Sequence, residues 1–66
     1  MMTKQKIDLN QVWKVKDKRF ERYVSIREIG ASYIRVATCT EQGSIISSRL
    51  TRVRADRFEK AFALHA

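Results

Sequence analysis

The chain lacks most of the residues from which metal sites and disulfide-stapled domains are built. Among its 66 residues there are one cysteine, Cys39, one histidine, His65, and no proline. A lone cysteine cannot form an intrachain disulfide, and one cysteine with one histidine cannot supply a zinc site. Because small domains without disulfides are typical of a reducing compartment, we expect a cytoplasmic protein without a metal or cofactor.

Long apolar runs and catalytic pairs are also missing. The longest unbroken apolar run extends only from Ala61 to Leu64, whereas a membrane-spanning helix needs about 20 apolar residues. The seven acidic residues are scattered and offer no pair suited to acid–base catalysis. Cys39 has no identifiable neighbouring base that would activate it as a nucleophile. We therefore expect neither an enzyme nor a membrane protein.

What the chain does contain is an excess of positive charge. Fourteen Lys and Arg stand against seven Asp and Glu, which gives a formal net charge of +7 at pH 7. Such an excess destabilises a compact domain by self-repulsion, so it indicates a partner of opposite charge. A phosphate backbone rewards each bound Lys or Arg through the release of a condensed counterion. An acidic protein surface or an anionic membrane would attract the same charge.

A chain of this length makes one domain at most. Residues 1–10 include Lys4 and Lys6 and have little apolar content, which predicts a flexible basic arm before a single domain over residues 11–66. A core this small supplies only ~3–5 kcal/mol of net stability. A ligand or a partner subunit would add to that stability, so a homodimer stays open.

Alternating apolar and polar residues predict two long strands, over residues 22–29 and 33–40. In each strand the β-branched residues share one face, and the aromatic and basic residues share the other. The alternation fails at Ile29, and a bulge near Glu28 would restore it. Gly30 begins a short hairpin loop and is free to adopt a positive φ.

A third long strand is expected over residues 44–54, after a turn that ends in Gly43. Its alternation is broken around Ile45 and Ile46, and a short strand over residues 12–15 precedes the whole meander. Closure of such a meander would remove its sheet edges. The sequence therefore predicts an all-β fold, a small five-stranded antiparallel barrel.

The last stretch, residues 55–66, is compatible with two structures. Phe58 and Phe62 are four residues apart among good helix formers, which favours a short helix. A 3₁₀ turn over residues 55–58 followed by a closing strand over residues 61–64 fits equally well. The predicted core draws on apolar residues from most of these segments: Trp13, Val24, Ile26, Ile34, Val36, Val53 and Phe58.

Five short motifs follow one another along the chain: Val12-Trp13, Asp17-x-Arg19, Arg22-Tyr23-Val24, Tyr33-Ile34-Arg35-Val36 and Thr51-Arg52-Val53-Arg54-x-Asp56-Arg57-Phe58. This order resembles small Src-homology-3-like barrels of the KOW and Tudor type, including bacterial and phage proteins of about this length. The resemblance implies a five-stranded barrel with a 3₁₀ turn before the last strand. It also implies a binding module for nucleic acid or a protein tail.

Arginines and tyrosines on the predicted strands are the candidate binding residues. An Arg fork can hold a phosphate bidentately, and aromatic rings between arginines can stack on bases. The set is Arg27, Arg35, Arg49, Arg52, Arg54, Arg57, Tyr23 and Tyr33. The alternatives are a solvated strand edge that prevents unwanted pairing, and tyrosines that shield the sheet or seal a dimer.

The function expected from these residues is that of a nucleic-acid-binding module. It would contact mainly the phosphate backbone of DNA or RNA with low sequence specificity, since no recognition helix is apparent. The alternative is a protein-interaction module, an adaptor or a phage-type inhibitor, that docks its Arg-rich face on an acidic protein surface. The salt dependence of binding to random DNA and RNA separates the two.

Overall fold

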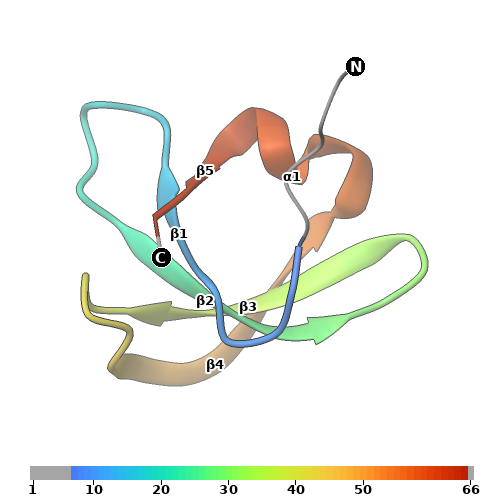
Figure 1. Cartoon of the computed structure of the whole chain (residues 1–66), viewed down its shortest axis with the longest axis horizontal. Helices are drawn as coiled ribbons and strands as arrows, with labels where there is room; N and C mark the ends of the chain where they lie inside the picture. The colour runs from blue at the N-terminus through green and yellow to red at the C-terminus, as the bar shows by residue number, and fades with distance from the viewer. Residues whose placement is uncertain (1–6, 66) are drawn as a thin grey trace.

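The computed structural model describes residues 7–65 and consists of one five-stranded antiparallel sheet with one short helix (Figure 1). The elements are β1 (Val12–Val15), β2 (Tyr23–Ile29), β3 (Tyr33–Cys39), β4 (Ile45–Arg54), α1 (Ala55–Ala61) and β5 (Phe62–Leu64). The all-β class and the antiparallel meander are confirmed. The predicted basic arm falls mostly on residues 1–6, which lie outside the described residues.

The sheet curls, but its two edge strands do not pair. The strand order is β4-β3-β2-β1-β5, so β4 and β5 lie at opposite edges and the expected closure into a barrel does not occur. Helix α1 lies between the end of β4 and the start of β5 (Figure 1). The helix occupies the place where direct pairing of β4 with β5 would have closed the barrel.

The segment after β4 combines the two structures that its sequence allows. Residues 55–61 form an α-helix in place of the expected 3₁₀ turn, and residues 62–64 form the closing strand against β1. Asp56 in the first turn and Lys60 in the last turn complement the helix dipole. The helix ends at Phe62, which adopts an extended conformation with φ −129° and ψ 152°.

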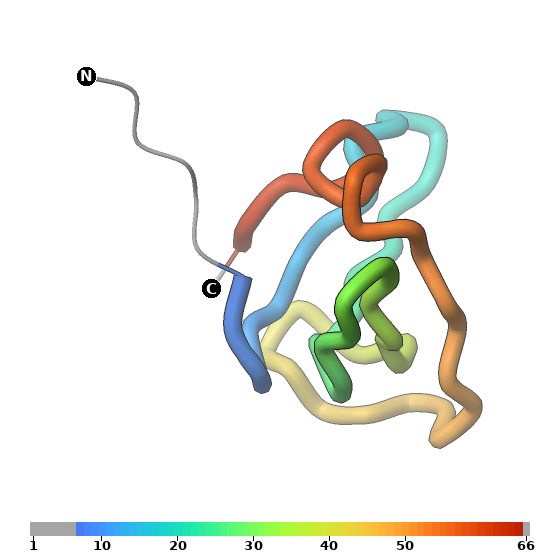
Figure 2. Tube along the Cα trace, turned by 90° about the vertical axis from the view of Figure 1, so that its right-hand side faces the viewer, coloured from blue at the N-terminus to red at the C-terminus, as the bar shows by residue number. Residues whose placement is uncertain are grey.

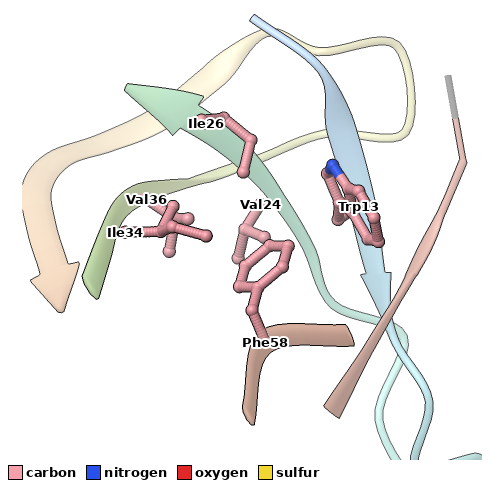
Figure 3. Packing of buried hydrophobic residues seen from close by; sticks show 6 residues of the cluster. All are labelled: Trp13, Val24, Ile26, Ile34, Val36 and Phe58. Atoms are coloured by element: carbon pink, nitrogen blue, oxygen red, sulfur yellow. The ribbon is translucent and has the colours of Figure 1, made fainter. Parts of the chain in front are cut away.

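The core lies on the concave face of the sheet, beneath α1 (Figure 3). The ring of Phe58 meets Trp13 edge-on at 4.9 Å between centroids and stacks on Phe62 at 4.8 Å. The indole of Trp13 donates to Oε1 of Gln11 at 3.1 Å, which satisfies its buried N–H. The buried cluster consists of six predicted core residues: Trp13, Val24, Ile26, Ile34, Val36 and Phe58. Only Val53 is partly exposed.

The bulge predicted near Glu28 is confirmed. The register of β2 with β3 shifts between Ile26 and Glu28, which makes Arg27 the extra residue. Beyond the bulge, Ile29 pairs with Ile34 and returns to the face that carries the core. A single inserted residue thus restores the alternation that the sequence breaks.

Gly43 lies in the predicted turn, whereas Gly30 serves a different purpose from the one the sequence suggested. Gly43 has a φ of +94°, a conformation that L-residues rarely adopt, and its amide donates to the carbonyl of Thr40 at 2.9 Å. Gly30 does not use a positive φ. A Cβ at Gly30 would come within 3.0 Å of the carbonyl oxygen of Tyr33, to which its amide donates at 2.8 Å. Gly30 is therefore required for close approach of the backbone.

Asp17 braces the loop between β1 and β2. Its Oδ2 accepts from Nη2 of Arg19 at 2.8 Å, and its Oδ1 accepts from the Arg19 amide at 3.0 Å. The side-chain and backbone hydrogen bonds from Arg19 lower the pKa of Asp17 below its ordinary value. This pair is solvent-exposed, so its contribution is to the shape of the loop more than to global stability.

Candidate nucleic-acid interface

Three arginines and a tyrosine gather on the outer face of β3 and β4. Arg35 pairs with Arg52 across the two strands, and Tyr33 pairs with Arg54. Directly opposed residues project on the same face with Cβ atoms about 4.5–5.5 Å apart. We call these four residues, Tyr33, Arg35, Arg52 and Arg54, the arginine–tyrosine patch.

The ring of Tyr33 organises the patch. The guanidinium carbon of Arg52 lies 5.0 Å from the ring centroid, and that of Arg35 lies 5.7 Å from it. Guanidinium groups are attracted to the negative face of an aromatic ring. The ring therefore restrains two long side chains in advance, which lowers the entropy that a bound phosphate would cost them.

Two carboxylates border the patch. Oε1 of Glu28 lies 3.4 Å from Nη1 of Arg35, and Oδ2 of Asp56 lies 3.3 Å from Nη2 of Arg54. Both pairs are substantially exposed, so each contributes little to stability and a phosphate can replace the carboxylate at small cost. Arg52 has no carboxylate partner within residues 7–65. Its charge is the least compensated in the patch.

The other predicted arginines lie apart from the patch. Arg27 sits in the β2 bulge and donates from Nη1 to Oδ1 of Asn10 at 3.1 Å. Arg49 is exposed in the irregular part of β4, and Arg57 is exposed on α1. The predicted phosphate contacts are thus distributed over four places, and of these only the arginine–tyrosine patch combines arginines with an aromatic ring on facing strand positions.

Tyr23 lies on the same face of the sheet as Tyr33 but far from the arginine–tyrosine patch. Tyr23 pairs with Cys39, six residues from Tyr33 along β3, which is about 20 Å at 3.3 Å per residue. Its ring lies 4.9 Å from the imidazole of His65, and Nζ of Lys14 lies 5.9 Å from its centroid. These contacts show that Tyr23 packs near the end of β5. At this distance Tyr23 and Tyr33 cannot stack on the same base.

A buried row on the outer face separates the two tyrosines, and sequence reasoning missed it. Val12, Ser25 and Ala37 follow one another across three strands, and all are buried. The turn between β3 and β4 lies against this row, since a Cβ at Gly43 would come within 3.2 Å of Cγ2 of Val12. In the sequence, the only sign that the β3–β4 turn packs over this row is the small size of Ser25 and Ala37.

Groups suited to metal or covalent chemistry do not assemble in the described part of the chain. Residues 7–65 contain no group of three or more His, Cys, Asp or Glu side chains that could hold a metal ion. Cys39 is buried at the end of β3, and burial raises the pKa of its thiol. No helix of these residues is long and apolar enough to cross a membrane. The arginine–tyrosine patch remains the strongest candidate site.

Comparison with known proteins leaves the family unassigned. No family model, curated protein or solved structure matches the chain. The structure itself supports a coarser description, a small five-stranded antiparallel sheet with barrel-like curvature.

Proposed function

We propose that the protein binds nucleic acid through the arginine–tyrosine patch, mainly by phosphate contacts and with low sequence specificity. The supporting observation is that Arg35, Arg52 and Arg54 surround Tyr33 on one accessible face of a chain with a formal charge of +7. Guanidinium forks hold phosphates bidentately, and each neutralised phosphate releases a counterion. The proposed setting is the cytoplasm.

Low sequence specificity follows from the elements that carry the patch. Within residues 7–65 the only helix is α1, which has seven residues and buries Phe58 in the core, so it is poorly suited to reading a major groove. Tyr33 is the patch's only aromatic ring, and stacking on a ring tolerates every base. Affinity should therefore come from the backbone of the nucleic acid.

The motif order and the observed fold together favour a Src-homology-3-like barrel of the KOW or Tudor type as the family we propose. The support is a curled antiparallel meander followed by a helical turn and a short last strand. Binding modules of this kind, found in bacteria and phages, fit a chain of this size.

A protein-interaction module, an adaptor or a phage-type inhibitor, is the second candidate. One observation favours it: Arg35 and Arg54 already donate hydrogen bonds to the carboxylates of Glu28 and Asp56, at 3.4 and 3.3 Å. An acidic protein surface would offer the same groups.

Binding of the wild-type protein to random-sequence DNA and RNA, measured by fluorescence anisotropy at several salt concentrations, tests the proposed function. The logarithm of the affinity should fall linearly with the logarithm of the salt concentration, with a slope near −0.7 to −0.9 per phosphate contacted. Absence of binding to both nucleic acids at ~50 mM salt, where such contacts are strongest, contradicts the proposal. The protein-interaction module would then take its place.

Replacing Glu28 with glutamine should raise the affinity for nucleic acid. The change removes the carboxylate that competes with phosphate for Arg35, and an exposed ion pair of this kind is worth up to about 1 kcal/mol, or roughly fivefold. The matched control is Glu21→Gln, which changes the net charge equally in the exposed loop between β1 and β2. Equal effects of the two variants would mean that only net charge matters and that the patch is not the site.

A further inference from the structure

Within residues 7–65, no further strand pairs with the long outer edge of β4. β4 has ten residues and lies at one edge of the sheet, whereas β5 at the other edge has only three. Figure 2 shows β4, in yellow to orange, running along the outside of the fold. A long open edge offers a row of unpaired backbone groups to another chain, so native proteins commonly cover or protect it.

The hydrogen bonds of the β3–β4 ladder show which groups of β4 face its neighbour. Just beyond β4, the amide of Ala55 donates to the carbonyl of Ser32 at 2.9 Å, so this pair is hydrogen-bonded. Bonded and non-bonded pairs alternate along an antiparallel ladder. The bonded pairs therefore include Val53 and Thr51, whose backbone groups point toward β3.

Leu50 and Arg52 occupy the alternate positions, so their N–H and C=O groups point away from β3 toward the open edge. On the N-terminal side of Leu50 the β3–β4 ladder is interrupted by a bulge, because residues 46–49 of β4 stand opposite Thr38 alone. The regular part of the edge is therefore residues 50–54. A docking strand would follow this part and end at the bulge.

The charge of β4 opposes pairing with a second copy of the chain. The strand carries Arg49, Arg52 and Arg54 and no acidic residue. A two-fold antiparallel pairing over residues 50–54 would be centred on Arg52, which would then face its own symmetry mate. Like charges directly opposite each other are destabilising. The same arginines would attract an acidic strand.

We propose that residues 50–54 of β4 receive an extended acidic segment of a partner protein as an additional strand. Acidic side chains at alternate positions of that segment would lie on the outer face beside Arg52 and Arg54. The side chains between them would lie on the opposite face, beside the partly buried Val53, and should be apolar. Backbone hydrogen bonds would supply affinity, and the alternating side chains would supply specificity.

This inference does not rest on the proposed nucleic-acid function, because it uses the backbone edge of β4 and a different class of partner. The two ligands share Arg52, however, so an acidic strand and a nucleic acid should compete for the protein. Such competition is expected only if both proposals hold.

Amide hydrogen exchange measured by NMR tests the docking edge. The probe is a synthetic peptide that alternates glutamate with valine, and its control has lysine in place of glutamate. In the free protein the amides of Leu50 and Arg52 should exchange fast, whereas those of Thr51 and Val53 should be protected. At a peptide concentration about ten times its Kd, exchange at Leu50 and Arg52 should slow roughly tenfold. The lysine peptide should leave it unchanged.

Two variants of Leu50 separate backbone pairing from side-chain contact. Leu50→Pro removes the outward N–H but no donor of the β3–β4 ladder, whereas Leu50→Thr keeps the N–H in a residue that favours strands. The proline variant should bind the acidic peptide at least about tenfold more weakly and the threonine variant within about twofold of wild type. Nucleic-acid affinity should change little in either, since Leu50 is not part of the patch.

Several results would overturn the proposal. They are equal peptide binding by a folded Leu50→Pro and Leu50→Thr, equal protection by the lysine peptide, or unchanged exchange at Leu50 and Arg52 with the acidic peptide. Protection of these two amides on raising the protein concentration without peptide would assign the edge to a second copy instead. If Leu50→Pro does not fold, the exchange measurement on the wild-type protein decides by itself. Failure of the wild-type protein to bind the acidic peptide, while it still binds nucleic acid, would reject this proposal alone.

Discussion

Replacing Phe58 with alanine is expected to unfold most of the protein at room temperature. Phe58 has 0% of its surface exposed and contacts the rings of Trp13 and Phe62. Truncation of a buried aromatic costs about 3–5 kcal/mol, which equals the ~3–5 kcal/mol that a core of this size supplies. Circular dichroism and a thermal melt would show the loss of the β spectrum and of the cooperative transition.

Phe20→Ala is the matched control for this change. Phe20 lies in the loop between β1 and β2 with 53% of its surface exposed, so its loss should change stability by no more than about 0.5 kcal/mol. A Phe58→Ala variant that melts at the wild-type temperature would show that α1 is not held by the core.

The strands could be predicted because alternation carries direct information about which face is buried. The failure of the pattern at Ile29 located the β2 bulge, and the break at Ile45 and Ile46 coincides with the irregular part of β4. Alternation could not show that the barrel stays open, and the predicted closure was wrong. Closure depends on whether residues 55–61 extend the sheet or leave it, and their good helix propensity allows the chain to leave it.

The candidate site could be predicted only in part, because alternation assigns a face but not a register. The sequence places Arg52 with Arg54 on one face and Tyr33 with Arg35 on another strand's outer face. Their meeting depends on the β3–β4 register, which single-sequence patterns do not supply. The same limit applies to Tyr23, which shares a face with Tyr33 but lies near the other end of β3.

Replacing Arg52 and Arg54 together with alanine should weaken nucleic-acid binding strongly and lower its salt dependence. If both side chains contact phosphates, the slope of log affinity against log salt should fall in magnitude by up to about two units. Sequence preference should change little, because phosphate contacts position the ligand without reading its bases. Anisotropy titrations over a range of salt concentrations give both the affinity and the slope. The fold should survive, since both arginines are exposed.

The matched control is the double change Lys18→Ala with Arg22→Ala, which removes the same charge from the exposed segment between β1 and β2. Counterion release depends on which cations touch the phosphates, whereas long-range attraction depends on the total charge. The control should therefore reduce affinity modestly and leave the slope nearly unchanged. Equal slopes in the two double variants would show that the protein attracts nucleic acid by its net charge alone. The arginine–tyrosine patch would then lose its role as the binding site, and the acidic strand proposed for β4 would be left as the ligand of these arginines.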